Sequence, residues 1–342
     1  MAKGTCPIIG ITLGDAAGIG PELVAKAAAR AGAKGMLTKD AIPLIVGDEA
    51  LLKMGMKIAG VDFKYNCVTG PAEVLTRESL SEGVVHLLDT KSVNVDALKL
   101  GEAAGINGKE ECERLVDCVN YCKMGLLDGF CFAPLNKSAM KAGGYDHPSE
   151  HEFFAELYEL KNYYSEMNVL DKLWNIRVTS HIPLKDVPGQ ITVENILKAS
   201  MLGYETLMKA GFNPPRLAMA ALNPHAGESG TCGTEEITVI AEAIRLLKDR
   251  GVTVEGPFAA DTLFIRAFRG DFDGVITMYH DQGQIAIKLK GFEHTVTVSC
   301  GMPHPITTPA HGTAYDIAGK GTALVSTFEH AYNLCVKMAQ DL

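Results

Sequence analysis

This sequence has no long apolar run and no excess of positive charge. Its 342 residues contain no stretch near the roughly 18 apolar residues of a transmembrane helix, so we expect no membrane span. Lysine and arginine number 32 against 41 aspartate and glutamate residues, and this net charge of -9 argues against nucleic acid as a partner. A small anionic substrate is still compatible, because a site can be locally basic.

The sequence also lacks a disulfide framework. Its nine cysteines are an odd number and include no CxxC pair, which indicates reduced thiols in a cytoplasmic protein rather than disulfides or a cysteine zinc site. The apolar stretch Ile8–Leu13 is too short for a signal peptide and ends at Gly14 and Asp15. We therefore expect a cytoplasmic location.

What the chain does contain is typical of a globular enzyme. Hydrophobic residues make up 47% and charged residues 21%, enough apolar material for a large core. The length predicts two domains or one large α/β unit. Strand-like runs such as Ile42–Gly47 alternate with helical patterns such as 103–127 and 235–250, and residues 62–94 look rich in strands. This alternation favours an α/β fold with a mostly parallel sheet.

The most informative stretch is Tyr279–Gly283, which follows the apolar run Gly274–Met278. It places a histidine, a carboxylate, an amide and a glycine in what we expect to be a flexible turn at the end of a strand. In open α/β sheets, ligands bind at such strand ends. Taken alone, the stretch is equally compatible with a polar surface turn.

Two further histidines occupy similar polar turns, at Thr179–Pro183 and Asn223–Glu228. His181, His225 and His280 could together hold a first-row divalent metal and leave a position open for substrate. Such a metal would polarise a hydroxyl or carbonyl oxygen. The spacing of the three histidines is not a motif, so three unrelated turns are the alternative.

Other polar residues offer acid, base and anion-binding chemistry. Lys137 and Lys288 could bind an anion or move a proton, and Asp261 and Asp281 could act as acid or base or simply cap turns. The glycines of 14–22 follow neither the dinucleotide nor the P-loop spacing, so a tight strand-to-helix turn is at least as good an explanation as ligand contact.

Seven motifs in order resemble the PdxA family, the 4-phosphohydroxy-threonine dehydrogenases, over nearly the whole chain. They are ITLGDAAGIGPE, APLNK, VTSHIPL, LNPHAGE, GPFAADT, YHDQG and HGTAYDIAGKG. The resemblance implies a two-domain α/β fold like that of isocitrate and isopropylmalate dehydrogenases, with mostly parallel sheets. We expect an outer nucleotide-side domain at 1–133 plus 277–342 and a central domain at 134–276. It also implies an obligate homodimer with an active site between domains that draws residues from both subunits.

The resemblance further implies NAD-dependent oxidation of a hydroxyl β to a carboxylate, followed by decarboxylation with a divalent metal. The metal ligands match His181, His225 and His280, with zinc expected first and cobalt, nickel or magnesium as alternatives. The remaining expected site residues divide by role. They are Lys137, Asp261 and Asp281 for catalysis, Glu150, His151, Lys288, Thr297 and Ile306 for substrate, and Gly301, His311, Thr313 and Asp316 for cofactor.

The chain departs from the family pattern in the substrate residues. The family's Gly-His-Thr-Glu is Ser149–Glu152 here, so its substrate-contacting His-Thr pair falls on Glu150 and His151. Lys288 is kept, but the family's Asn falls on Thr297 and its Arg on Ile306, and an Asp that commonly precedes HGTA is Ala310. Loss of an arginine removes a cationic fork, and a glutamate repels a phosphate dianion. We expect a small hydroxy acid other than the vitamin B6 precursor, such as a four-carbon sugar-acid phosphate or a dihydrodiol carboxylate.

Two other classes of function stay open at this stage. One is a non-catalytic relative that binds a small acid, and the other is a metal-dependent lyase or hydrolase without nicotinamide. The retained histidines, lysines and aspartates favour an enzyme, and the HGTAYDIAGKG loop favours a nicotinamide cofactor. The sequence does not choose between NAD and NADP.

Overall fold

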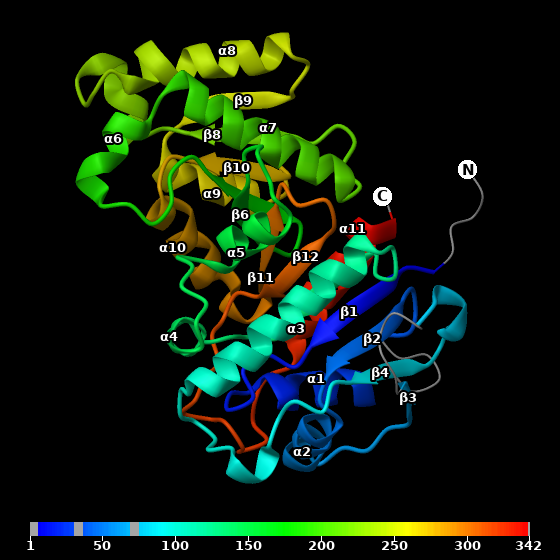
Figure 1. The fold of residues 1–342 in the computed structure, drawn as a ribbon. Helices are drawn as coiled ribbons and strands as arrows, with labels where there is room; N and C mark the ends of the chain where they lie inside the picture. Colours follow the sequence, from blue (N-terminus) through cyan, green and yellow to red (C-terminus); the bar gives the residue numbers. More distant parts are fainter. Residues whose placement is uncertain (1–5, 31–36, 69–74, 341–342) are drawn as a thin grey trace. The chain divides into compact units, whose positions relative to one another are not determined.

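The computed structural model describes residues 6–30, 37–68 and 75–340 (Figure 1). They form two compact units, which we call the first unit (Met1–Leu160 with Met302–Gln340) and the second unit (Lys161–Gly301). These ranges differ from the expected domains, because residues 134–160 join the first unit and residues 277–301 the second. The expected ranges also include residues outside the described part of the chain.

The first unit is built on a parallel sheet with the strand order β3-β4-β2-β1-β5-β12, in which every described pairing is parallel. Its strands are β1 (Ile8–Thr12), β2 (Ile42–Gly47), β3 (Tyr65–Val68), β4 (Val85–Asp89), β5 (Gly129–Phe132) and β12 (Ile306–Pro309). Its helices are α1 (Gly20–Ala29), α2 (Glu49–Ala59), α3 (Gly105–Lys123), α4 (Lys137–Ala142), α5 (Glu150–Leu157) and α11 (Ser326–Gln340), with short turns η2 (Arg77–Ser79) and η3 (Val95–Ala97).

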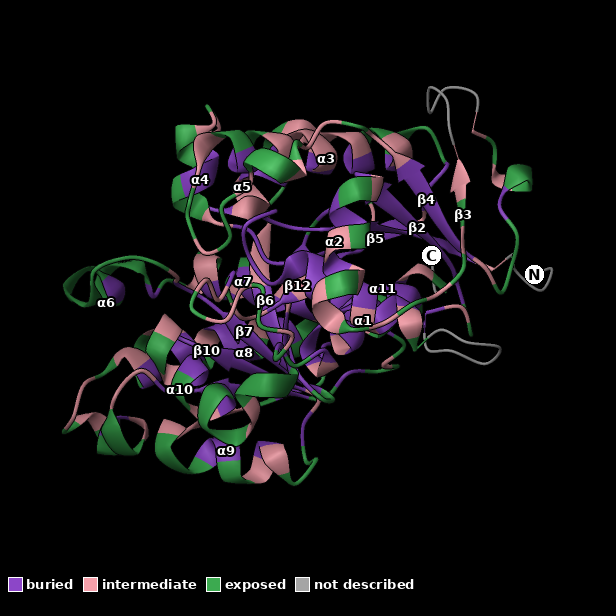
Figure 2. Ribbon diagram, turned by 90° about the horizontal axis from the view of Figure 1, so that it is seen from below, coloured by how far each residue is buried: buried purple, intermediate pink, exposed green. Residues whose placement is uncertain are grey.

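The core of the first unit follows from its apolar strands. Every residue of β1, with the sequence IIGIT, is buried, as expected for a strand covered on both faces. In Figure 2 strands such as β2 and β5 carry the buried colour. Helices α4 and α5 both pack against α3, which explains why residues 134–160 belong to this unit.

The second unit has the strand order β11-β6-β7-β10-β8-β9. Strands β7, β10, β8 and β9 run parallel, whereas β6 is antiparallel to both β7 and β11. The strands are β6 (Ser165–Leu170), β7 (Leu173–Arg177), β8 (Leu217–Ala220), β9 (Val254–Phe258), β10 (Gly274–Thr277) and β11 (Thr295–Cys300). The helices are α6 (Val187–Gln190), α7 (Val193–Lys209), α8 (Ala241–Asp249), α9 (Ala260–Phe268) and α10 (His280–Gly291), with shorter turns η4 (Leu184–Asp186), η5 (Pro224–Gly230), η6 (Glu236–Ile240) and η7 (Phe292–His294).

The expected α/β architecture with mostly parallel sheets is confirmed, with two local corrections. Tyr279–Gly283 is not a flexible turn, because α10 begins at His280. The expected helix 235–250 is confirmed as a continuous helical segment, in which the π-helical η6 leads directly into α8. Residues 62–94 contain only β3 and β4 as strands, although 69–74 lie outside the described residues. Among the helices that are described, none combines the length and apolar character needed to cross a bilayer.

Candidate functional site

The three histidine turns follow the carboxyl ends of three neighbouring parallel strands of the second unit. His181 comes after β7, His280 after β10 and His225 after β8, and β10 lies between the other two strands. Carboxyl ends of parallel strands meet at one edge of a sheet, the usual location of ligand sites in α/β proteins. The fold therefore brings three histidines that are far apart in sequence to one edge of the sheet.

Two residues of the stretch around His280, Gln282 and Gly283, have structural roles. Gln282 accepts from Met278 N–H and donates to Ala221 O, both at 2.7 Å, and so ties the end of β10 to the end of β8. A Cβ on Gly283 would lie 2.3 Å from the amide oxygen of Asn175, so only glycine fits there without rearrangement. Gln282 and Gly283 therefore fix the start of α10.

His280 and His181 line one pocket of about 320 Å³. Their ring centroids are 5.5 Å apart. Nδ1 of His280 lies 2.7 Å from Oδ1 of Asp281, the arrangement in which a carboxylate orients an imidazole and leaves Nε2 for a metal. Tyr279, Thr179 and the apolar side chain of Ile182 also line the pocket.

Two of the histidines have a left-handed backbone. His181 has φ 51° and His225 has φ 53°, and the left-handed conformation continues from His225 through Ser229. A non-glycine residue in this region costs about 1–2 kcal/mol. Such strain persists only where the surroundings enforce it, and it is concentrated at functional sites.

The His225 turn is enforced by buried Glu236. Its Oε1 accepts from the backbone N–H groups of Leu222 and Asn223, both at 2.8 Å, and its Oε2 accepts from the Asn223 amide at 3.0 Å. Burial opposes ionisation of Glu236, but these hydrogen bonds outweigh it and hold the pKa of the carboxyl below its usual value. The turn is thus built around a fixed carboxylate.

Two of the three histidines lie close together, as ligands of one divalent metal would, and the third lies apart from them. His181, His280 and the supporting Asp281 suit zinc chemistry. His225 has Nδ1 at 3.8 Å from Glu228, and among the described residues the three imidazoles do not form a group whose ligand atoms all lie within 4.8 Å. The structure thus pairs His181 with His280 and leaves His225 one strand further along the edge.

The other candidates in the second unit lie on several elements. Asp261 is exposed in the first turn of α9, at the carboxyl end of β9. Lys288 is exposed near the end of α10. Thr297 on β11 accepts a hydrogen bond from Asn168 at 3.0 Å. Gly301 has φ 87°, which requires glycine.

In the first unit, two candidates form an ion pair. Nζ of Lys137 is 3.8 Å from Oε2 of Glu150, joining the starts of α4 and α5. Ser149 caps α5 by accepting from Glu152 N–H, and its hydroxyl lies 2.9 Å from Nδ1 of His151. Glu150 is thus partly neutralised by Lys137.

Ile306 does not fit the expected substrate-contacting role. It has no exposed surface and pairs with Phe130 in the sheet of the first unit. Its apolar side chain is buried in the first unit, where β12 pairs with β5. The position where the family has an arginine therefore supplies no ligand contact from its side chain here.

The expected cofactor loop is fastened to the first glycine turn. Ile19 N–H donates to Thr313 O at 3.0 Å, and the Tyr315 hydroxyl donates to Asp15 at 2.7 Å. Burial raises the pKa of Asp15, opposed by this hydrogen bond. Asp316 is exposed. The glycine turn 14–22 therefore holds loop 311–321 in place. This agrees with the explanation of its glycines as a tight strand-to-helix turn.

Loop 311–321 begins at His311, and Lys26 of α1 contacts the chain at the other end of the loop. Burial lowers the pKa of His311, so its imidazole is held toward the neutral form. Lys26 donates to the carbonyl oxygens of Gly321 and Ala323 at 2.9 and 2.8 Å. The loop is thus pinned at its far end by helix α1.

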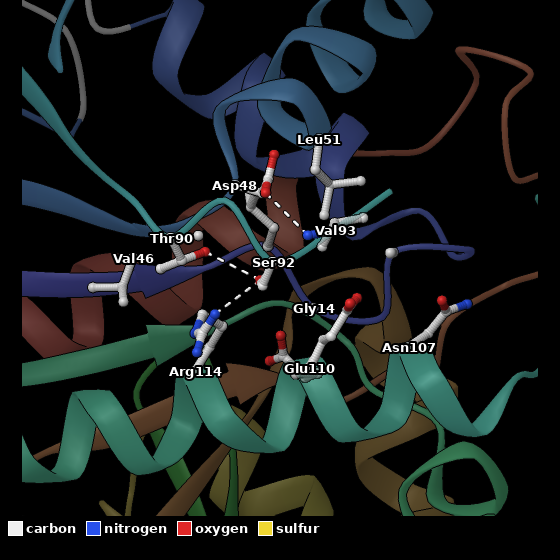
Figure 3. A pocket seen from close by; sticks show the side chains of 14 residues that line it. Gly14, Val46, Asp48, Leu51, Thr90, Ser92, Val93, Asn107, Glu110 and Arg114 are labelled. Atoms are coloured by element: carbon white, nitrogen blue, oxygen red, sulfur yellow. Dashed lines mark hydrogen bonds between the residues drawn. The ribbon is translucent and has the colours of Figure 1, made fainter. Parts of the chain in front are cut away.

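A small pocket at the carboxyl ends of β1, β2 and β4, lined by both polar and apolar side chains, was not predicted from the sequence (Figure 3). Asn107, Glu110 and Arg114 line it from one face of α3, and Arg114 donates to Ser92 at 2.9 Å. Its space of about 20 Å³ is that of a single water molecule. Glu111 on the same face is buried, accepts from Thr12 at 2.7 Å, and burial raises its pKa to about 8.

Comparisons with known proteins agree over nearly the whole chain. Residues 39–335 match the family described as pyridoxal phosphate biosynthetic protein PdxA. A D-threonate 4-phosphate dehydrogenase from Cupriavidus necator is 38% identical and covers 93% of this chain and 92% of its own. A crystal structure of a 4-hydroxythreonine-4-phosphate dehydrogenase from Burkholderia phymatum is 36% identical, covers 98% and 99% of the two chains, and has a TM-score of 0.80.

A more distant solved structure shows the wider fold. A β-decarboxylating dehydrogenase from Thermococcus kodakarensis is 14% identical, covers 95% of this chain and 81% of its own, and has a TM-score of 0.50. The expected dehydrogenase fold is thereby confirmed. With a family match over 39–335 and dehydrogenases related along nearly the full length, the chain is an oxidoreductase that belongs to the PdxA family.

Proposed function

We propose that this protein is an NAD-dependent dehydrogenase of a phosphorylated 3-hydroxy acid that requires a divalent metal. Hydride passes from the carbon bearing the hydroxyl to NAD, and the hydroxyl proton passes to a base. The resulting β-keto acid loses carbon dioxide, and the carbon left behind takes up a proton. The names of the Burkholderia and Cupriavidus relatives support a phosphorylated hydroxy acid as substrate.

The observation that carries the proposal is the pairing of His181 with His280, supported by Asp281. Two imidazoles from adjacent strand ends and a carboxylate on Nδ1 of one of them suit a catalytic metal. We propose His225 as the third ligand and zinc as the metal, with cobalt, nickel or magnesium as alternatives. When bound, the metal would polarise the oxygen of the hydroxyl or ketone.

The roles we propose for the other side chains follow from their surroundings. Asp281 orients His280, and Lys137 and Asp261 are the candidates for proton transfer. Lys137 starts from an ion pair with Glu150, so an incoming substrate anion competes with Glu150 for the ammonium. Loop 311–321, held by its neighbour in the first unit, would take the nucleotide.

The residues Ile306 and Glu150 also affect which substrate the site should prefer. Ile306 offers no cation, and Glu150 places a negative charge beside Lys137. A lost charge-assisted contact costs on the order of 1.5–3 kcal/mol, or roughly ten- to a hundred-fold in specificity. We therefore propose a four-carbon sugar-acid phosphate, the class named in the Cupriavidus relative, ahead of 4-phosphohydroxy-threonine.

We also propose that the protein works as a cytoplasmic homodimer. The exposed face of α10 carries Ile285 and Leu289, one turn apart, with 58% and 84% of their surface accessible. Neighbouring exposed apolar side chains of this size favour burial against another protein surface. Light scattering at micromolar concentration should give twice the mass of 36.6 kDa. A fully active monomer would contradict this part of the proposal.

The substrate proposal is tested by steady-state kinetics on protein with added zinc or cobalt and NAD. Absorbance of reduced nicotinamide is followed with threonate 4-phosphate, 4-phosphohydroxy-threonine and an unphosphorylated diol acid. We expect the sugar-acid phosphate to have the highest kcat/KM and Glu150→Gln to improve use of the amino-acid phosphate. If the amino-acid phosphate is best in the wild type, the interpretation of Glu150 and Ile306 is wrong. Absence of reduction with every acid would contradict the dehydrogenase proposal itself.

A further inference from the structure

Arg177, the last residue of β7, is a charged group with no exposed side-chain surface. Burying a guanidinium costs several kcal/mol unless each of its donors is matched. Its Nη2 donates to Glu166 Oε1 at 2.5 Å, its Nη1 to Asn168 Oδ1 at 2.6 Å and its Nε to Ser180 Oγ at 2.7 Å. All three directions of the fork are therefore occupied, by residues that lie before and after β7 in the chain.

The network extends to further elements of the second unit. Asn168 donates to the Thr297 hydroxyl at 3.0 Å and accepts from the amide of Gln284 on α10. Arg177 is thereby joined to β6, β11 and α10 of the second unit. Hydrogen bonds around a buried charge fix the relative positions of the groups they join, although Oε1 of Gln284 has no partner among the described residues.

The same network holds the turn that carries His181. The Ser180 hydroxyl accepts from Arg177, and the Thr179 hydroxyl donates to Met278 O at 2.7 Å. Both residues before His181 are thus anchored through their side chains, and His181 itself has the left-handed φ of 51°. Glu166, the anion paired with Arg177, has Oε1 at 3.8 Å from Nε2 of His181.

We propose that Arg177 is a positioning residue for the metal site: through Ser180 and Glu166 it fixes the backbone and the imidazole of His181. The inference rests on the proposed metal site and deepens it. It explains why His181 keeps a left-handed backbone, since an unusual backbone conformation needs neighbours that enforce it. Without Arg177, the turn relaxes and His181 leaves its orientation toward His280.

The test compares two neutralised ion pairs of the second unit. The double variant Arg177→Met with Glu166→Gln removes both charges, so no unpaired charge stays buried. The matched control is Arg216→Met with Asp273→Asn, which removes the bidentate pair that precedes β8 and β10, at the strand ends away from the histidines. Cobalt binding by calorimetry and hydrogen exchange of the amides of 179–182 are measured for both.

We expect the Arg177 pair to raise the Kd for cobalt by roughly 10- to 100-fold, as for other residues that orient metal ligands, and to speed exchange of those amides. The Arg216 pair should lower only the unfolding temperature. Equal cobalt affinity in the two double variants would overturn the inference. If the first double variant does not fold, Arg177→Lys decides, because lysine keeps the charge but cannot reach three partners; wild-type affinity in R177K would overturn it.

His181→Ala separates this failure from failure of the metal site. If His181→Ala binds cobalt as tightly as the wild type, the proposed metal site is wrong and this inference falls with it. If His181→Ala loses cobalt while the Arg177 variants keep it, only the positioning role of Arg177 is wrong.

Discussion

In the first unit, the proposed nucleotide loop is fastened to an ordinary glycine turn by hydrogen bonds from Tyr315 and to Thr313. In the second unit, the His181 and His225 turns hold a left-handed backbone against an intrinsic cost. Both regions carry family motifs, but the loop of the first has one left-handed non-glycine residue, Ala314 with φ 44°, whereas the second has such residues at His181 and along the His225 turn. In the second region, the strained backbone holds the histidine side chains in fixed directions, which is the arrangement expected where chemistry needs fixed geometry.

The largest expected effect is a loss of turnover that occurs in a variant of the second unit and not in a control variant of the first. His280→Ala should lower turnover by about 10³-fold, because metal polarisation contributes several kcal/mol. His304→Ala is the control in the first unit, where its ring stacks on Tyr158. Turnover in the His280 variant within tenfold of the control would contradict the assignment of chemistry to the second unit.

A buried acid of the first unit should affect stability instead. Burial raises the pKa of Glu111 from 4.5 to about 8, so the folded state keeps it neutral while the unfolded state ionises. The contribution of Glu111 to the free energy of unfolding is therefore fully present below pH 4.5 and is lost as the pH rises toward 8. Glu111→Gln should therefore stabilise the protein by on the order of 3 kcal/mol at pH 7 and by little at pH 4. Denaturant unfolding at both values checks this, and a pH-independent difference would contradict it.

The fastening of the nucleotide loop gives a smaller effect. Tyr315→Phe removes the hydrogen bond to Asp15, which is worth about 1.5–3 kcal/mol because the acceptor is charged. We expect weaker NAD binding in a calorimeter with cobalt binding unchanged. Tyr279→Phe, in the pocket of the second unit, is the matched control and should leave NAD affinity as in the wild type.

The smallest effect has the opposite sign. His181→Gly should stabilise the metal-free protein by about 1 kcal/mol, because glycine adopts the left-handed backbone without cost. His280→Gly should destabilise it by roughly 0.5–1 kcal/mol, since His280 is helical. Thermal unfolding measures both, and a loss of stability in the His181 variant would mean that its backbone is not strained.

Much of this fold was predictable because local patterns agreed with it. The apolar runs of β1 and β2 indicate buried parallel strands, and the motif order indicates the dehydrogenase fold. The unit boundaries were not predictable, because the pairing of β11 with β6 and the packing of α4 and α5 on α3 depend on long-range contacts.

The site was predictable only in part for the same reason. A histidine after a strand can be recognised in sequence, and the fold brings three of them to one sheet edge. The left-handed backbone of His181 and His225 and the roles of Gln282 and Glu236 depend on partners more than ten residues away. A charged Arg177 inside the apolar pattern Leu173–Val178 was the one local signal of the buried network.

The central claim is that His181 and His280, with His225, hold one divalent metal. Elemental analysis of the purified wild type and of the three single alanine variants tests it most directly, with His304→Ala alongside. We predict one metal per chain in the wild type and in the control, and a sharp loss in each of the three variants. Full metal occupancy in all three would contradict the account.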